Sequence, residues 1–182
     1  SLCTPKLVDD VTECIFLPTL HAMRKRGAPF SGLLYAGLML TPEGPKVVEF
    51  NCRFGDPETQ AILPMLTSSL LDPMMTVARG AKLKHVAPFT WRDGASVTTV
   101  VASSGYSDAP KTGAGIELPS FGDAIRVYHA GTTRAADGVL RTSGGRVFAV
   151  TAVAPTFSAA QRASRDAAAA IGKCGLSAAR RG

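Results

Sequence analysis

The sequence has little of several features that mark special classes of protein. Its four cysteines, Cys3, Cys14, Cys52 and Cys174, include no Cys-x-x-Cys pair, so neither a zinc site nor a thiol-redox motif is indicated. No apolar run approaches the roughly 18 to 20 residues that a helix needs to cross a bilayer, and the first residues do not resemble a secretory signal. We therefore expect a soluble, cytoplasmic protein with free thiols and no membrane partner.

Acidic residues are also scarce relative to basic ones, with 14 Asp and Glu against 20 Lys and Arg and a formal charge of +6. The basic residues are scattered, and only Arg24 to Arg26 and Arg180 to Arg181 form runs. This distribution predicts no nucleic-acid partner, whereas a net positive field suits phosphorylated substrates. A basic binding module without catalysis stays open as an alternative.

The first half of the chain predicts helices around a β-hairpin. Residues Val8 to Arg26 are expected to be helical, with a kink or a division at Pro18. Two β-like segments, Leu33 to Leu40 and Lys46 to Asn51, flank a Thr-Pro-Glu-Gly-Pro turn and predict an antiparallel hairpin. Asp56-Pro57 and Asp72-Pro73 each have the chemistry of a helix start, with Asp as the expected N-cap.

The second half predicts a sheet and one long helix. Turn clusters separate four β-like segments, and an Ala-rich helix follows: Ser96 to Ala102, Ile125 to His129, Val139 to Thr142, Arg146 to Val153, then Ser158 to Ile171. The composition changes after Lys84, so we predict one domain over residues 1–84 and a small β-rich domain over 85–182. The fold class is accordingly α/β (α+β).

The segment that bears most on function is KVVEFNCRFGDPETQ, Lys46 to Gln60. In a strand, Glu49 and Asn51 project from one face, and we expect Val48 and Phe50 to be buried on the other. A carboxylate and an amide oxygen are ligands that suit Mg²⁺, which commonly completes its coordination with phosphates and water. Arg53 follows with a charge suited to phosphoryl oxygens, and the helix expected at Asp56-Pro57 would offer free N–H groups to anions.

A family resemblance extends this interpretation. The run LLYAGLMLTPEGPKVVEFNCRFGDPETQAILP, Leu33 to Pro64, resembles the ATP-grasp core of the phosphoribosylamine–glycine ligases. Further similar runs follow in order: Ser103 to Tyr106, Tyr128 to Thr132, which includes His129, and Gly144 to Thr151. The resemblance implies the C-terminal lobe of an ATP-grasp domain followed by a small β-rich C-terminal domain.

The resemblance also implies a reaction and roles for residues. Glycine, ATP and 5-phosphoribosylamine would give glycinamide ribonucleotide, ADP and phosphate, in purine biosynthesis. Glu49 and Asn51 would hold Mg²⁺ (or Mn²⁺), Arg53 would stabilise the transferred phosphoryl group, and Asp56 and Glu58 would shape the substrate pocket. The role of His129 stays open between a pocket-side residue and a strand histidine with a satisfied hydrogen bond.

The sequence departs from the family pattern in two places. The family's N-terminal substrate domain, Gly-rich loop and ATP-grasp lysines do not precede the motif, and the usual C-terminal run is replaced by GKCGLSAARRG. We therefore expect an N-terminally truncated piece that is inactive alone, from a parent that could be monofunctional or fused to other purine-pathway domains. Another ATP-grasp ligase, or a carboxylase of similar architecture, is the alternative enzyme.

Overall fold

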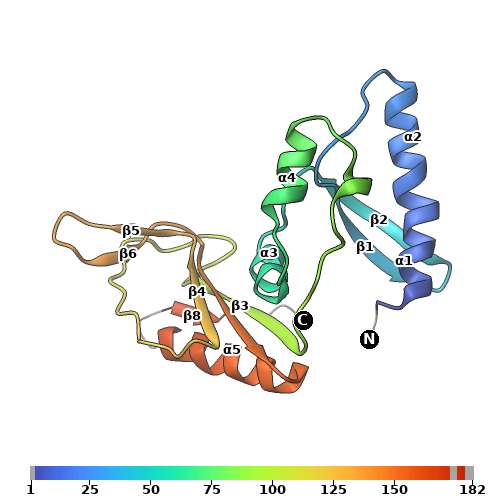
Figure 1. The fold of residues 1–182 in the computed structure, drawn as a ribbon. Coiled ribbons are helices and arrows are strands. Elements are labelled where there is room, and N and C mark those ends of the chain that lie inside the picture. The colour runs from blue at the N-terminus through green and yellow to red at the C-terminus, as the bar shows by residue number, and fades with distance from the viewer. Residues whose placement is uncertain (1–2, 173–175, 179–182) are drawn as a thin grey trace. The chain divides into compact units, whose positions relative to one another are not determined.

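The computed structural model describes residues 3–172 and 176–178, and it divides into two compact units. The first unit comprises residues 1–55 and 69–88, and the second comprises residues 56–68 and 89–182 (Figure 1). Helices and sheets occur in both, which confirms the expected α/β class. The boundary expected after residue 84 stays a prediction. None of the helices in the described residues combines the length and hydropathy that crossing a membrane requires.

A long helical stretch begins the first unit, and Pro18 does not break it. It comprises α1, the π-helical segment η1 and α2: Pro5–Val11, Thr12–Phe16 and Leu17–Lys25. The backbone N–H of Leu17 donates to the carbonyl of Thr12, five residues earlier. This wider turn lets the chain pass Pro18, which has no N–H to donate, so the expected kink takes the form of a π-helical segment.

The predicted hairpin is confirmed as β1 (Tyr35–Thr41) and β2 (Gly44–Asn51), paired antiparallel. The two strands form a sheet of their own, with no third strand among the described residues. After residues 56–68, the first unit resumes with α4 (Leu71–Ala78) and the short 3-10 helix η3 (Leu83–His85). Helix α4 begins at Leu71, so Asp72 lies inside it and the expected cap is wrong; the Asp72 N–H donates to Ser69 Oγ.

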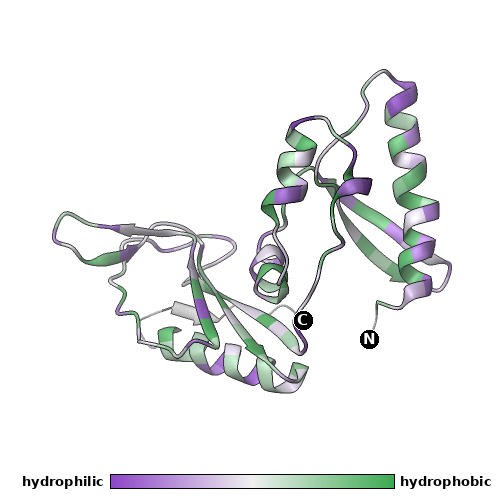
Figure 2. Cartoon of the chain, viewed as in Figure 1, coloured by the Kyte–Doolittle hydropathy of each residue, from purple (hydrophilic) through white to green (hydrophobic). Residues whose placement is uncertain are grey.

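The first unit buries few apolar side chains, although β1 and β2 are largely apolar in sequence (Figure 2). Among its described residues, the only large hydrophobic side chains classed as buried are Val11 and Ile15. Large apolar residues of both strands and of α4 are exposed, Val48 by 67% and Leu71 by 63%. Because burial of apolar surface is the main driving force of folding, this unit has little of its own to hold it together.

The second unit is built on a four-stranded antiparallel sheet of order β4-β7-β3-β8. A separate hairpin, a short helical segment and one long helix complete it. In chain order the elements are α3 (Glu58–Ile62), η2 (Leu63–Met65), β3 (Ala95–Ser103), β4 (Ile125–His129), β5 (Thr132–Arg134), β6 (Leu140–Thr142), β7 (Arg146–Ala154), α5 (Phe157–Gly172) and β8 (Leu176–Ala178). The predicted strands and the Ala-rich helix are confirmed, whereas β5 and β8 were not expected.

Helices α5 and α3 lie on opposite faces of the β3–β7 pair. Thr99 shares a hydrogen bond of 2.7 Å with Ser164 of α5, whereas the adjacent Thr98 shares one of 2.7 Å with Thr151. Thr151 in turn donates to the carbonyl of Gln60 in α3, at 3.0 Å. Successive residues of a strand point to opposite faces, so the two helices cover different sides of the sheet.

The hydrophobic core of the second unit lies between the sheet and α5. Strands β3 and β7 contribute Val101, Phe148 and Val150, and the helix contributes the small side chains of Ala167 and Ala168 together with Ile171. Ser164 is fully buried within this helix, and its Oγ donates to the carbonyl of Val150 at 2.9 Å. The alanines allow the helix to approach closely, and the buried hydroxyl keeps a hydrogen-bond partner, as burial requires.

The ends of β3, β4 and β7 meet at a close approach of backbone. The N–H of Ser103 donates to the carbonyl of Gly145, and the N–H of Gly131 donates to that of Arg146, both at 2.8 Å. A Cβ on Gly131 would lie 2.6 Å from the Arg146 carbonyl oxygen and 2.8 Å from the Gly144 Cα. The glycines therefore permit three segments, separated in sequence, to touch through their main chains.

This close approach predicts that adding a single methyl group at Gly131 destabilises the second unit. Gly131→Ala should lower the free energy of unfolding by about 1 to 3 kcal/mol, because backbone atoms must move to admit the Cβ. Gly122→Ala is the control, because nothing lies within 4 Å of its Cβ, and it should change stability by less than about 0.5 kcal/mol. Urea unfolding followed by fluorescence of Trp91, the one tryptophan, reports on this unit. Equal effects of the two substitutions would contradict the tight contact.

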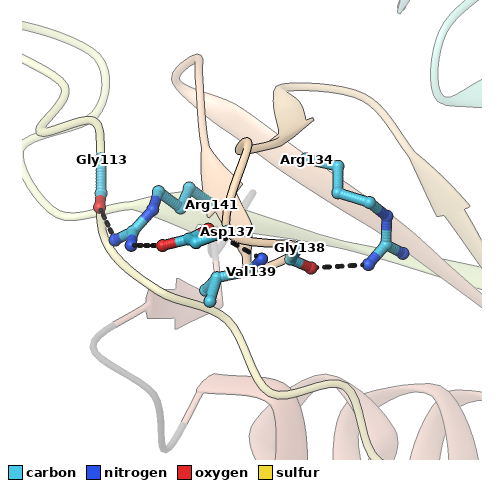
Figure 3. A network of polar contacts seen from close by, with 6 residues as sticks. All are labelled: Gly113, Arg134, Asp137, Gly138, Val139 and Arg141. Atoms are coloured by element: carbon cyan, nitrogen blue, oxygen red, sulfur yellow. Dashed lines mark hydrogen bonds and ion pairs between the residues drawn. The ribbon is translucent and has the colours of Figure 1, made fainter.

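Asp137 closes the β5–β6 hairpin (Figure 3). Its Oδ1 accepts from the N–H of Val139 at 3.0 Å, and its Oδ2 accepts from Arg141 Nη2 at 2.8 Å. Arg141 also reaches the carbonyl of Gly113, and Arg134 donates to the carbonyl of Gly138 at 2.8 Å. The Val139 N–H, and then the guanidinium of Arg141, hold the pKa of Asp137 below its usual value.

The lowered pKa sets the sign of a pH effect. Both contacts favour the ionised carboxylate of Asp137. Their contribution to the free energy of unfolding is therefore present above the pKa that Asp137 has in the unfolded chain, and it is lost as the pH falls through the lower pKa of the folded chain. The Asp137 side-chain carbon signal, followed by NMR, should titrate below that of an unstructured Asp peptide. Arg141→Met should move the titration upward without abolishing the shift, because the Val139 contact remains. A titration equal to that of the peptide would refute this assignment.

Candidate functional site

The hairpin brings Glu49 and Asn51 together on one face of β2, as their spacing predicts. The Nδ2 of Asn51 donates to Oε1 of Glu49 at 2.9 Å. The pair stands at the end of the strand, where Asn51 is opposite Tyr35 of β1 and Glu49 is opposite Gly37. A carboxylate and an amide are therefore held side by side on a strand rather than on a loop.

Gly37 provides the space for the Glu49 side chain, which sequence reasoning missed. A Cβ at position 37 would lie 3.3 Å from Cγ of Glu49, closer than an ordinary van der Waals contact. The register of the strands shifts between Gly37 and Leu38, so that Val48 has no partner directly across the hairpin. The glycine inside the β1 sequence was the available signal, since a glycine in a strand commonly marks a bulge or a close approach.

The expectation that Val48 and Phe50 are buried behind this pair is wrong. Val48 is 67% exposed and Phe50 is 38% exposed. The hairpin is a separate two-stranded sheet, and both side chains keep much of their surface exposed on it. A face pattern fixes which side chains point together, but it does not supply the layer that buries them.

Arg53 is exposed, and its Nη1 donates to the carbonyl of the adjacent Phe54 at 3.0 Å. This contact is local and leaves other N–H groups of the guanidinium able to reach a ligand. Glu58 is half-buried in the first turn of α3. The roles expected for Arg53 and Glu58 stay predictions.

Asp56 is not the N-cap of the following helix, so that expectation is wrong. The helix begins at Glu58, Pro57 occupies the cap position, and no side chain caps it. The Asp56 carboxylate instead accepts from Gln60 Nε2 at 3.1 Å and from Arg146 Nη2 at 3.3 Å. Because α3 has only five residues, its N-terminus gives little support to the anion site expected there.

His129, whose role the sequence left open, has structural partners. Nδ1 of His129 shares a hydrogen bond of 2.9 Å with Thr132, and its ring meets that of Phe148 edge to face. Within the described chain, Cys14 and Cys52 are free thiols, and Cys174 lies outside it. A depression on the helical stretch contains none of the motif residues; it is lined by Glu13, Leu17, Pro18, Leu20, His21 and Arg24.

The donor set of the hairpin pair fits a hard divalent cation. Among the described residues, no group of three or more His, Cys, Asp or Glu side chains is placed to hold a metal ion. Glu49 and Asn51 offer two oxygens, provided that the Asn51 amide turns its oxygen towards the ion. Two protein oxygens, with phosphates and water completing the shell, are what Mg²⁺ commonly takes.

Two family descriptions match the chain in succession. "Phosphoribosylglycinamide synthetase, ATP-grasp (A) domain" matches residues 1–59, and "Phosphoribosylglycinamide synthetase, C domain" matches residues 96–180. A segment of an ATP-grasp domain that carries a carboxylate–amide pair thus precedes a C domain in one chain, which places the chain among the ATP-grasp proteins. The chain belongs to the phosphoribosylglycinamide synthetase family.

Individual relatives agree with this assignment. The phosphoribosylamine–glycine ligase of Caulobacter vibrioides is 45% identical over 166 residues, which cover 90% of this chain and 39% of the relative. The trifunctional purine biosynthetic protein adenosine-3 of Gallus gallus is 46% identical over 166 residues, covering 88% of this chain and 16% of the relative. The crystal structure of the Thermotoga maritima phosphoribosylamine–glycine ligase matches with a TM-score of 0.77 and 32% identity, over 97% of this chain and 42% of that one. The chain thus spans about two-fifths of the length of the ligases it matches.

The pair predicts where a divalent cation contacts the chain. Paramagnetic Mn²⁺ broadens NMR signals near its binding site, so amide signals of residues 49–51 should broaden at lower Mn²⁺ concentration than those elsewhere. Glu49→Gln should raise the required concentration several-fold, because it removes the charged oxygen ligand.

Glu43→Gln is the matched control for this measurement. Glu43 is a carboxylate at the turn of the same hairpin, where it accepts from Thr41 Oγ1. Its substitution should leave the broadening at residues 49–51 unchanged. Broadening that is the same in the Glu49→Gln protein would count against a site at this pair.

Proposed function

We propose that this chain carries the metal-binding strand and the C domain of an ATP-dependent ligase that joins glycine to 5-phosphoribosylamine. The products are glycinamide ribonucleotide, ADP and phosphate, within cytoplasmic purine biosynthesis. The observation that carries the proposal is the Glu49–Asn51 pair, hydrogen-bonded on one face of a hairpin within the stretch that matches the family. The names of the relatives favour this ligase over the carboxylase alternative.

The reaction has two steps. In the first, a carboxylate oxygen of glycine attacks the γ-phosphorus of ATP, and the bond from that phosphorus to the bridging oxygen breaks to release ADP. In the second, the amine nitrogen of phosphoribosylamine attacks the acyl carbon of the glycyl phosphate. Phosphate leaves with the electrons of the C–O bond, and the nitrogen loses a proton to solvent.

In this scheme the hairpin residues hold and neutralise phosphate charge. Glu49 and Asn51 would hold Mg²⁺ (or Mn²⁺), which would supply positive charge to neutralise and orient the phosphates. Arg53 presents a guanidinium to the phosphoryl oxygens during transfer, with N–H groups arranged for two parallel hydrogen bonds. Glu58 and Asp56 shape the substrate pocket, Asp56 by holding the chain in place through its contacts with Gln60 and Arg146.

The chain by itself lacks groups that phosphoryl transfer needs. Positioning and charge neutralisation supply most of the rate, so a clamp on the ATP triphosphate and an ordered acceptor are required besides the metal. The relatives are more than twice as long as the matched segment, and the first unit leaves apolar strand residues exposed. We therefore expect the remaining parts of such a ligase to supply the clamp, and fusion to other purine-pathway domains is compatible with the Gallus gallus relative.

The proposal is tested in a chimera in which this chain replaces the matching segment of the Caulobacter vibrioides ligase. The chimera should release ADP in a manner that depends on both glycine and phosphoribosylamine. Glu49→Gln should lower turnover by about 10²-fold or more, because a charge that neutralises the transferring group is lost. An unchanged turnover of the Glu49→Gln chimera at ordinary magnesium concentration would refute the role of Glu49.

Two controls accompany this experiment. Glu43→Gln in the same chimera removes a carboxylate from the hairpin turn and should leave ADP release unchanged. The isolated 182-residue chain should release no ADP with the same substrates. Robust turnover by the isolated chain would show that the account of the missing groups is wrong.

A further inference from the structure

The chain passes from the first unit to the second between Gly55 and Asp56, a point that we call the crossing. Arg146, which belongs to the second unit, contacts the first residue after the crossing. Nη1 of Arg146 donates to the backbone carbonyl of Asp56 at 2.9 Å, and Nη2 reaches Oδ2 of the same residue at 3.3 Å. One guanidinium thus contacts both the main chain and the side chain of the first residue after the crossing. The two residues are 90 positions apart in the sequence.

The contact continues into the sheet through a chain of hydrogen bonds. Oδ1 of Asp56 accepts from Gln60 Nε2, so both oxygens of the carboxylate are engaged. The carbonyl of Gln60 accepts from Thr151, whose hydroxyl also pairs with Thr98 of the neighbouring strand. The start of the segment 56–68 is therefore fixed to β7 and β3 by polar contacts of defined direction.

The exposure of this ion pair indicates that it fixes geometry more than it adds stability. The side chains of Arg146 and Asp56 are 34% and 48% exposed. Pairs with this exposure contribute little to stability, since solvent screens them. A planar guanidinium nevertheless fixes two acceptors at a set separation, which the single ammonium of a lysine cannot do.

The backbone of Arg146 is itself held in place. Its carbonyl accepts from the N–H of Gly131 at 2.8 Å, within the close approach that excludes a Cβ at Gly131. Arg146 also belongs to the run Gly144 to Thr151, whose similarity to the family is otherwise without a functional explanation. A fixed backbone gives the guanidinium a fixed origin, as a positioning role requires.

We propose that Arg146 is a positioning residue for the ligase reaction. By holding Asp56, it fixes the chain at the crossing, a few residues after the proposed metal-binding residues of β2. Glu49, Asn51 and Arg53 precede Asp56 by seven, five and three residues. This proposal rests on the proposed function, and it assigns Arg146 no contact with substrate. A displacement of about 1 Å in such groups can lower a rate by about 10²-fold.

The first test measures the clamp without activity. In the 182-residue chain, Arg146→Met should speed hydrogen–deuterium exchange in peptides covering residues 56–60 and leave β3 unchanged. Arg141→Met is the matched control, because the Arg141–Asp137 pair has a similar exposure of 37% and 52% and does not lie at the crossing. Unchanged exchange around Asp56 in the Arg146→Met chain would overturn the proposal.

The second test measures turnover in the chimera. Arg146→Met should lower kcat by about 10-fold to 10²-fold, with the KM for MgATP changed much less, and Arg146→Lys should recover only part of kcat. In an Asp56→Ala background, Arg146→Met should cause a smaller further loss of kcat than in the unsubstituted chimera, because the side-chain contact is already absent and only the contact with the carbonyl of residue 56 remains. Arg141→Met should retain full kcat.

Three other results would overturn the proposed role of Arg146. Full kcat in the Arg146→Met chimera would overturn the proposal even if exchange around Asp56 were faster. A loss that is equal in the presence and absence of the Asp56 side chain would also overturn it. An unsubstituted chimera that releases no glycine-dependent ADP, with the clamp shown by exchange, would overturn the proposed function and with it the role of Arg146 in that reaction.

Discussion

The pairing of β3 with β7 is the interaction on which the second unit depends. Each strand has nine residues, and the pair is covered on one face by α5 and on the other by α3. The α5 face is apolar apart from the half-buried Thr99 and the buried Ser164, whereas hydroxyl contacts join the other face to Gln60. One strand pair thus supports both the hydrophobic core and the polar clamp at the crossing.

The first unit shows the opposite balance. It carries the Glu49–Asn51 pair on a paired strand, yet large apolar residues of both strands are exposed and little is buried around them. Burial supplies most of the free energy that holds a site in place. The local geometry of this pair therefore lies on a unit that its own residues support only weakly. In the proposed ligase, chain beyond this segment would complete both the burial and the grip on ATP.

Local sequence patterns predicted most of the elements correctly because they report local physics. Alternation along β2 was sufficient to place Glu49 and Asn51 together, and the Thr-Pro-Glu-Gly turn was sufficient to predict the hairpin. Caps were less reliable: Asp56 and Asp72 precede prolines as N-caps commonly do, but Asp56 has stronger partners in Gln60 and Arg146. A charged partner 90 residues away leaves no signal in the local sequence.

The sequence by itself determined most of the strands and helices, the chemistry of the Glu49–Asn51 pair and, through its motifs, the family. Only the tertiary structure decided which faces are covered, because burial depends on the element that packs there: β7 is covered on both sides, whereas Val48 is exposed. The same holds for the meeting of Arg146 with Asp56. Spacing along a strand is fixed by covalent geometry, but contacts between distant segments depend on how the whole chain packs.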